Sequence, residues 1–508
     1  MRRLLLLLVL AGCTGGAPAS PGGEPAEELT AGYLGQRLRR LGSRELQRSI
    51  EDLTSIVVDA SRVANLLVPR KYDNGDPDTW VTSDALDTVE SVAWWVADEV
   101  VKTKPARVYS GCSADDACRA QLLGVVVPRI YRRPLRSAEA SRYDALWREG
   151  AGAGTDDAVR LVLAAALQSP AFLYREEIGT HDRDDRVALL EPHEIGAEIS
   201  YLVVGSTPDD ELLAAAREGR LATRADRLAQ VDRLLATPRA AEQQKHFLDL
   251  YLATSESSAL GKSPSLFPGF RGRPLGVELG RMLEGVIEEG ASPRALLTLP
   301  HALGPQVPAS YADGAPPVRG VLMHPGFLAT HASYDHSNPV ARGLFVLTNL
   351  LCAAPSAPPP GIPRAPNPAS QQKTTRGRFA EHSSQPMCQS CHRAIDGIGF
   401  GFEEYDAIGR FRVTENGEPV DASGLLPADG REVPYRGVRE LTEMLASSQQ
   451  VSDCYSRHIV RFALGAGERD SDVSVYENLS RGSTPDTTYA DRIRRVVASP
   501  AFVERRLP

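Results

Sequence analysis

TPDDELLAAAREGRL (residues 207–221) carries the signals of an α-helix in the order in which a helix needs them. Thr207 is a suitable N-cap, and Pro208 suits the first turn that follows it. The next two residues, Asp209 and Asp210, place negative charge at the positive end of the helix dipole. Leucine and alanine then recur at helical spacing. Comparable patterns extend along the chain in both directions, whereas strand signals are few and short, so the sequence predicts a mainly α protein.

The helical patterns fall into five units, which predicts a multi-domain protein. Ser43 and Ser137 are predicted helix caps within the first two units. The predicted units are an N-terminal helical domain (31–108), a small helical domain containing YRRPL (109–180), a central helical domain (188–315), a CxxCH domain (319–425) with a Pro-rich segment at 355–368, and a C-terminal helical domain (431–508).

The first residues are typical of a targeting segment. Arg2 and Arg3 precede the apolar run 4–10, and the sequence Leu-Ala-Gly before Cys13 resembles a lipobox. We therefore expect residues 1–13 to be a lipoprotein signal peptide, with lipid attached to Cys13, and residues 14–30 to be a flexible tether. The protein is then exported and anchored to a membrane of the cell envelope, and Thr14 after the cysteine favours the outer membrane.

Composition and motifs exclude several other classes of function. The net charge of −8 is spread along the chain without a basic stripe, which argues against nucleic acid as a partner. After the first residues no apolar run is long enough to span a bilayer. The sequence contains no Gly-rich phosphate loop, no GxSxG elbow and no HExxH helix, so no reaction class is indicated.

CQSCH (residues 388–392) is the motif with the sharpest chemical meaning. Cys388 and Cys391 can each bond a vinyl group of haem, and the adjacent His392 can then ligate the iron. The aromatic and aliphatic residues that follow, from Ile395 to Tyr405, could form the wall of an apolar haem pocket. The motif thus predicts a covalently bound haem c.

Three alternatives remain open for the same motif. The two cysteines could form a disulfide, or they could bind zinc together with His382 or Cys454. They could also be the remnant of a haem site that no longer binds the group.

The second axial ligand of the iron is less well indicated. Met444 could supply a thioether sulfur, although a methionine among apolar neighbours is more often part of a core. His382 and His458 are alternatives, and a five-coordinate iron is a further one. His324, His331 and His336 form a separate cluster, but their spacing fits no standard metal-ligand pair, which favours structural roles.

The cysteine count predicts two disulfides. The remaining cysteines, after Cys13 and the CxxCH pair, are even in number, as expected for an exported protein. Cys112 and Cys118 are close enough in the chain for a local bridge. Cys352 and Cys454 are then paired by elimination.

Several longer motifs resemble one family over nearly the whole chain. They are YRRPLRSAE (131–139), EISYLVVGSTPDDELLAAAREGRL (198–221), RGVLMHPGFLATHAS (319–333) and CHRAIDGIGFGFEEYDAIGRFR (391–412). They resemble the planctomycete and myxobacterial family of exported, cytochrome-c-like proteins that are built from several domains of unknown function. The chain departs from the family pattern at Gly397, where proline is usual, and at Ala466, where arginine is usual.

The resemblance implies a cytochrome-c-like segment in the C-terminal part of the chain, with haem c at Cys388, Cys391 and His392. From this we expect a lipid-anchored protein that transfers single electrons to a redox partner, within a larger oxidoreductase assembly. The alternative is a structural or ligand-binding envelope lipoprotein in which CxxCH is a disulfide or zinc clamp.

The lipobox assignment predicts the behaviour of one variant. Cys13→Ala removes the thiol that accepts the lipid, so the protein should no longer incorporate radioactive fatty acid and should leave the membrane fraction. Cys388→Ala, which removes a cysteine outside the lipobox, serves as the control and should label normally. Continued labelling of Cys13→Ala would show that the lipobox assignment is wrong.

Overall fold

The computed structural model describes residues 34–66, 72, 82–184, 186–255, 257–355, 370–384, 386–465 and 473–507. The predicted signal peptide and tether, and all but the first residue of the predicted Pro-rich segment, lie outside these ranges. Within them the protein is mainly helical and multi-domain, and its strands are short, which confirms the prediction of a mainly α, multi-domain protein. No helix in the described ranges has the length and apolar character needed to cross a membrane.

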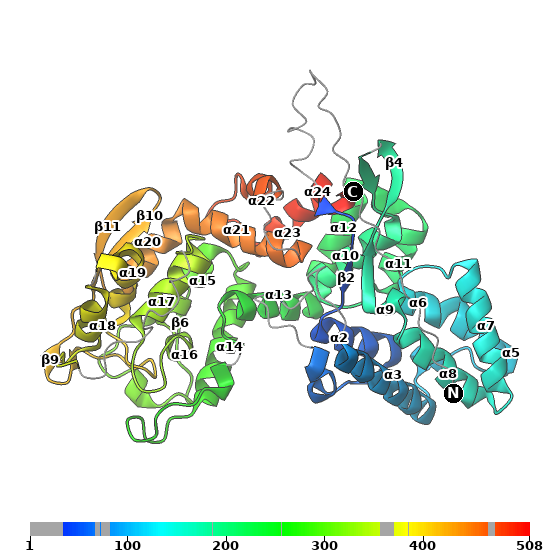
Figure 1. Ribbon diagram of the computed structural model, residues 1–508, viewed down its shortest axis with the longest axis horizontal. Coiled ribbons are helices and arrows are strands. Elements are labelled where there is room, and N and C mark those ends of the chain that lie inside the picture. Colours follow the sequence, from blue (N-terminus) through cyan, green and yellow to red (C-terminus); the bar gives the residue numbers. More distant parts are fainter. Residues whose placement is uncertain are drawn as a thin grey trace, which may run out of the picture.

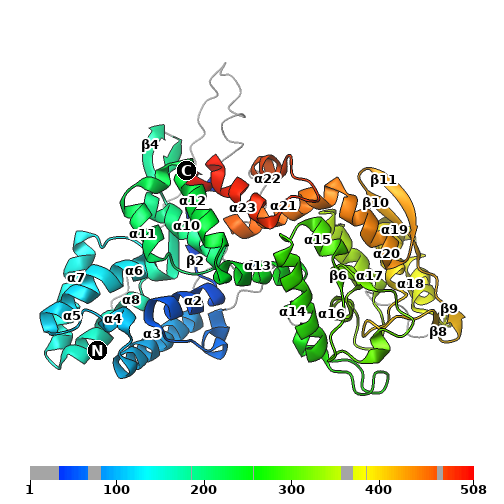
Figure 2. The same ribbon diagram turned by 180° about the vertical axis from the view of Figure 1, so that it is seen from behind.

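Two lobes lie side by side (Figure 1), and the view from behind shows the same division (Figure 2). The N-terminal lobe extends from β1 to α12, and the C-terminal lobe extends from α14 to α20. Helix α13 (Pro238–Tyr251) runs from the first lobe to the second, and helix α21 (Gln449–Leu464) runs back towards the first. The two lobes are thus connected by two chain segments.

The N-terminal lobe contains the described residues of the first and second predicted units and the beginning of the third, whose later helices are α13 and the first helices of the C-terminal lobe. In chain order its elements are β1 (Leu34–Gly35), β2 (Arg37–Arg40), α2 (Ser43–Thr54), η1 (Ala60–Leu66), α3 (Ser83–Thr103), α4 (Ala106–Tyr109), α5 (Asp115–Gln121), the π-helical turn η2 (Leu122–Val126), α6 (Val127–Tyr131), α7 (Ser137–Ala151), α8 (Thr155–Leu167), α9 (Pro170–Leu173), β3 (Tyr174–Glu177), β4 (Thr180–Asp184), β5 (Val187–Leu189), α10 (Pro192–Val204), α11 (Asp210–Arg217), η3 (Arg220–Ala222) and α12 (Arg224–Leu235). One hydrophobic core takes buried side chains from Leu41 to Leu173, so the first two predicted units share a core.

The C-terminal lobe and the segment from α21 to the end of the described chain share a second, larger core with α10 to α13. The elements of the lobe are η4 (Ser257–Ala259), α14 (Gly272–Glu288), α15 (Pro293–Thr298), β6 (Pro300–His301), η5 (Ala309–Tyr311), β7 (Val318–Arg319), η6 (Val321–Met323), α16 (Pro325–Thr330), α17 (Pro339–Phe345), the π-helical turn η7 (Val346–Leu350), α18 (Thr375–Ser383), α19 (Pro386–Gly399), η8 (Phe400–Phe402), β8 (Thr414–Glu415), β9 (Glu418–Pro419), β10 (Ser423–Ala428), β11 (Arg431–Arg436) and α20 (Gly437–Ser447). The chain returns through α21, α22 (Val473–Ser480), α23 (Tyr489–Ala498), α24 (Pro500–Val503) and β12 (Glu504–Arg506).

In three helices the N-terminal cap differs from the one that the sequence predicted. Helix α11 starts at Asp210, and its cap is Asp209, whose carboxylate accepts the Leu212 N–H at 2.9 Å. Thr207 is therefore not the cap, because the carboxylate two residues later reaches the unpaired amide. Ser43 and Ser137 are the first residues of α2 and α7. In both helices the glutamate two residues later accepts the N–H of the residue before the helix, at 3.0 and 2.7 Å.

Strands from distant parts of the chain complete one sheet in the N-terminal lobe. Its order is β1-β12-β5-β4, with β12 parallel to β1 and antiparallel to β5. Beside it β2 pairs with β3, Arg37 opposite Glu177 and Arg40 opposite Tyr174. The last strand of the described chain thus lies between the first strand and the strand that leads to α10.

Aromatic rings fill the region where α13 and α21 meet. Phe247 of α13 lies with its ring centroid 5.2 Å from Phe462 and 5.8 Å from Tyr455, both on α21. Tyr251 packs edge-on against Tyr455 at 5.2 Å. Tyr489 of α23 contacts Phe247 at 5.5 Å. These rings join the C-terminal part of α13 to α21.

A buried ion cluster lies between β2, β3 and β12. Glu177 is fully buried, and its carboxylate contacts Arg37 at 2.8 Å, Arg39 at 3.3 Å and Arg505 at 2.7 Å. Burial alone would raise the pKa of Glu177, but the charges of the three arginines outweigh burial and hold the pKa below its ordinary value. The carboxylate is therefore charged at neutral pH.

The cluster extends from Glu177 to two further helices. Arg39 also contacts Glu198 of α10 at 2.6 Å, and Glu198 contacts Arg175 at 3.2 Å. Arg37 donates a hydrogen bond to the carbonyl oxygen of Leu464, at the end of α21, at 2.6 Å. The cluster thus joins both ends of the described chain to α10 and to the helix that returns from the C-terminal lobe.

Glu177→Gln should lower the free energy of unfolding at pH 7 by about 3–5 kcal/mol, because it leaves buried guanidinium groups without their counter-charge. Chemical denaturation followed by circular dichroism measures the change. Glu176→Gln is the matched control, since Glu176 precedes Glu177 in β3 and is partly exposed beside Arg133 and Arg136. That variant should change stability by no more than about 1 kcal/mol. Equal effects of the two variants would contradict the role given to Glu177.

Candidate functional site

The CxxCH motif lies in the first half of helix α19, with Cys388 and His392 one turn apart. Cys388 is half-buried and is a free thiol within the described part of the chain. The side chain of Cys391 lies outside the described residues. Helix α19 crosses α17 at close range, because a Cβ atom on Gly343 would lie 2.1 Å from the carbonyl oxygen of Ile395. The absence of a side chain at Gly343 thus lets α19 pack directly on the C-terminal lobe.

His392 has a carboxylate partner one turn further along the same helix. Its Nδ1 atom lies 3.1 Å from Oδ1 of Asp396. This hydrogen bond raises the pKa of His392, against the opposing effect of burial. Asp396 is buried, and its Oδ2 atom has no hydrogen-bond partner among the described residues. The pair fixes the orientation of the imidazole ring and favours a proton on Nδ1.

A hollow of about 470 Å³ opens beside His392, between α18, α19 and β10. Its volume is within the range of small-molecule sites. The Arg376 guanidinium lies 4.5 Å from the centre of the Phe400 ring at its wall. The lining residues are Arg376, Ala380, Ser383, Ser384, Gln389, His392, Arg393, Asp396, Gly397, Phe400, Ser423, Gly424 and Leu425.

The lining differs from the apolar wall that the sequence suggested. Of the apolar residues after the motif, Phe400 lines the hollow, whereas Ile395, Ile398, Phe402 and Tyr405 belong to the main core. Ile395 and Ile398 face away from the hollow because α19 is amphipathic and its apolar side packs on the rest of the C-terminal lobe. Phe402 and Tyr405 follow the end of α19 and are buried in the same core. Most of the residues that line the hollow are polar or charged.

The proposed second axial ligands are not brought to the hollow. Met444 on α20 is partly buried and packs against the main core, and it is not among the lining residues. His458 is buried on α21, where its Nδ1 lies 2.8 Å from the hydroxyl oxygen of Tyr72. The side chain of His382 lies outside the described residues.

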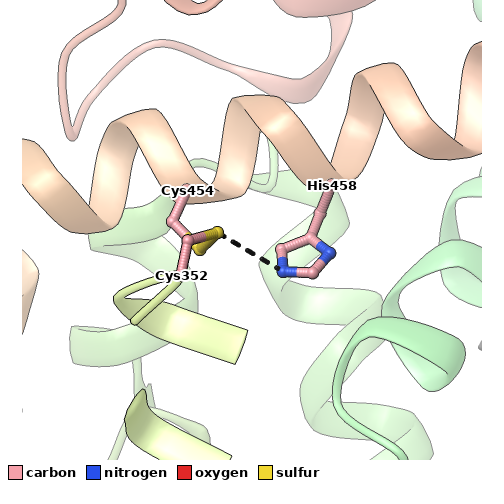
Figure 3. A group of neighbouring side chains, drawn as sticks. All are labelled: Cys352, Cys454 and His458. Atoms are coloured by element: carbon pink, nitrogen blue, oxygen red, sulfur yellow. Dashed lines mark hydrogen bonds between the residues drawn. A yellow bond between two sulfur atoms is a disulfide. The ribbon is translucent and has the colours of Figure 1, made fainter. Parts of the chain in front are cut away.

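Cys352 and Cys454 are joined in a disulfide, with their Cα atoms 5.4 Å apart (Figure 3). His458 points at this bridge, with Nε2 3.9 Å from Sγ of Cys352. These three side chains form the one grouping of possible metal ligands found among the described residues. Because the two sulfur atoms are bonded to each other, neither is available as a thiolate ligand. Cys454 also cannot complete a zinc site with Cys388 in this state.

The other predicted bridge and the histidine cluster have local structural positions. Cys112 and Cys118 are joined in a disulfide at the start of the second predicted unit. His324 accepts the N–H of Gly326 at the start of α16, and His331 hydrogen-bonds the carbonyl oxygen of Leu252 at 2.9 Å. Burial lowers the pKa of His324 to about 3 and that of His331 to about 4, so both are neutral at pH 7. His336 hydrogen-bonds the carbonyl oxygen of Ser337. The three histidines have separate partners.

Asp396 is the residue of this site that the sequence prediction missed. Its signal was present, because a carboxylate four residues after a histidine lies on the same face of a helix. Arg376 could not be found in this way. It reaches the hollow from another helix, and only the fold brings the two together.

Four segments match family models that are described as proteins of unknown function. They are DUF1595 at residues 118–177, DUF1592 at 190–306, DUF1588 at 319–415 and DUF1585 at 430–502. The chain is therefore a multidomain protein built from domains of unknown function. No curated protein and no solved structure matches it.

The two disulfides should differ in their contribution to stability. Removal of the Cys352–Cys454 bridge by a double alanine substitution releases a loop of 102 residues, whereas Cys112–Cys118 spans 6. Loop-closure entropy then predicts losses of about 5 and about 2 kcal/mol, respectively. Denaturant unfolding of both double variants measures the difference, and each is the control for the other. A larger loss for the short bridge would rule out this explanation.

Proposed function

We propose that the chain is a mono-haem, c-type electron-transfer protein of the cell envelope. Haem would be bonded to Cys388 and Cys391, with His392 as the axial ligand of the iron. When bound, the group supplies reversible one-electron chemistry at iron. The observation that carries the proposal is the hydrogen bond between His392 and Asp396 within a CxxCH motif, beside a hollow.

The residues of the site fit this group. A histidine that binds a metal through one ring nitrogen usually donates its other N–H to a carboxylate or a carbonyl group. Asp396 accepts from Nδ1 of His392, so the ligand atom in the proposed site would be Nε2. The carboxylate also raises the basicity of the imidazole, which favours the ferric state and lowers the reduction potential.

The surroundings of the motif also support the proposal. The hollow has the size of a cofactor site, and two arginines, Arg376 and Arg393, are among its lining residues. Guanidinium groups are suitable partners for the two carboxylates that a haem carries. The hollow is open to solvent on one side, which would let a redox partner come close to the group.

The family match supports the proposal at a coarser level. The DUF1588 model, PSCyt3, covers the CxxCH motif, and the four matched domains are those of a planctomycete family of cytochrome-c type. We therefore also propose export, with lipid on Cys13 as the anchor and a redox protein as partner. Met444 is not part of the proposed site, because it packs against the main core.

The alternative function is a non-redox envelope lipoprotein in which CxxCH is a clamp. In its zinc form, the motif would need ligands beyond the two cysteines and His392. Cys454, which the sequence offered as one of these, is bonded to Cys352. The structure therefore gives this alternative less support than the haem site.

Expression of the exported chain together with the cytochrome c maturation proteins should give one covalently bound haem per chain, measured by its pyridine haemochrome spectrum. Cys388→Ser with Cys391→Ser should give none. Absence of covalent haem in the natural sequence under these conditions would overturn the proposal, and a stoichiometric zinc content would favour the clamp.

Two further variants test the role of single side chains in the loaded protein. Asp396→Asn should retain haem but raise its reduction potential, because the amide oxygen is a weaker acceptor for Nδ1–H and leaves the imidazole less electron-rich than the carboxylate does. Asp429→Asn, an exposed substitution on the β10–β11 turn, is the matched control and should leave the potential unchanged. Met444→Leu should leave the visible spectrum unchanged. Loss of a methionine-ligation band would show that Met444 is an axial ligand.

A further inference from the structure

A second cavity, of about 760 Å³, lies in the N-terminal lobe, between the π-helical turn η2 and helices α6, α7, α10 and α11. One wall comes from the segment matched by DUF1595 and the other from the segment matched by DUF1592. Both views place these helices in the lobe opposite to α19 (Figures 1 and 2). The cavity is therefore separate from the proposed haem site, and it has no part in the function proposed above.

The walls of the cavity are mainly apolar. The apolar lining residues are Leu123, Val125, Pro128, Pro134, Leu135, Ala140 and Leu213. The volume is within the range of sites that enclose a small organic molecule. Solvent in such a cavity is readily displaced by an apolar group, because it gains few hydrogen bonds from the walls.

The π-helical turn gives the cavity part of its shape. Pro128 has no N–H to donate to the carbonyl group of Gly124, four residues earlier, so an α-helix cannot continue unchanged through this point. The backbone widens instead into η2, and turns of this kind are frequent at functional sites. A Cβ atom on Gly124 would meet no atom within 4 Å. The absence of a side chain at Gly124 thus leaves space in the wall.

The charged groups of the cavity are predominantly cationic. Arg129, Arg133 and Arg217 line it, against the single carboxylate of Asp210. Arg129 pairs with Asp210 at 2.6 Å, and Arg133 pairs with Glu139 behind the wall at 2.8 Å. Arg217 has no carboxylate within ion-pair distance among the described residues. The cavity therefore has an excess of positive charge that an anion would balance.

His193, at the start of α10, also lines the cavity. Its Nδ1 atom is buried and has no hydrogen-bond partner among the described residues. Burial lowers the pKa of His193, and the charges of Arg217 and Arg133 lower it further. The imidazole is thus neutral at pH 7, and it experiences the same positive potential that would attract an anion.

We propose that this cavity binds a small organic anion with an apolar body, such as a medium-chain carboxylate. The apolar body would lie against the leucine, valine and proline side chains, and the anionic group would be bound by Arg217. A cation is disfavoured by the excess of arginine, and an uncharged apolar molecule would make no ionic contact with Arg217. A carboxylate at this end satisfies both parts of the lining at once.

The test uses the full exported chain and the fluorescent anion 1-anilinonaphthalene-8-sulfonate, which has an apolar body and one negative charge. The probe should bind with increased fluorescence. Octanoate should displace it at lower concentration than octan-1-ol or octylammonium, which have the same apolar chain. Equal displacement by the three compounds, or no binding of either the probe or octanoate, would overturn the proposal.

Two variants locate the binding. Gly124→Leu should abolish probe binding by filling the cavity, with circular dichroism as the check that the helix is retained. Arg217→Met, at an exposed position where folding is not at risk, should weaken octanoate binding by about tenfold or more, the usual effect of losing a charge-assisted hydrogen bond. Arg224→Met is the matched control on α12, outside the cavity. Octanoate affinity that is the same in Arg217→Met and in Arg224→Met would place the binding elsewhere and overturn the proposal.

Discussion

The buried carboxylate of Glu177 is the constraint on which the arrangement of this protein depends. Burial of a charge away from water raises the free energy of the folded state, unless the ion-pair partners of that charge are present. Here the partners come from β2 at one end of the described chain and β12 at the other. The N-terminal lobe can therefore reach its final state only when both ends of the chain are present. Partly assembled states are destabilised, because each leaves a charge inside the protein with fewer of its partners.

A continuous set of contacts leads from this cluster to the candidate haem site. Arg37 binds the last turn of α21, and α21 carries Cys454, which is bonded to Cys352 directly after the turn η7. That turn continues α17, the helix on which α19 packs. The position of His392 in one lobe is thus fixed through covalent and polar contacts to the other lobe. The aromatic rings between α13 and α21 support the same connection by packing.

The local features of the sequence predicted much of the secondary structure and the chemistry of single segments. Helical periodicity gave the fold class, because it reflects the spacing of side chains along a helix. Cysteine parity and spacing gave the two pairs that the structure joins. The predicted helix caps were less accurate. Thr207 and Asp209 are both suitable caps for α11, and the choice between them depends on backbone angles that the residue types do not determine.

Features that depend on distant contacts could not be predicted. Glu177 looks like any strand glutamate in the sequence, and only the fold brings Arg505 to it. Met444 has the same neighbours in the sequence whether it faces a cofactor or a core. The direction of the α19 apolar face was misjudged for the same reason, since its packing partner, α17, lies some forty residues earlier in the chain.

The place of β12 in the sheet has a consequence for how the protein is made. Glu177 and Arg505 are 328 residues apart in the chain. At a synthesis rate of 5–20 residues per second, roughly 15 to 65 s pass between the appearance of the carboxylate and that of its last partner. During this interval the gap between β1 and β5 has unpaired backbone groups and an incompletely neutralised charge. Until β12 is available, the unpaired edge of β5 can pair with a strand of another chain.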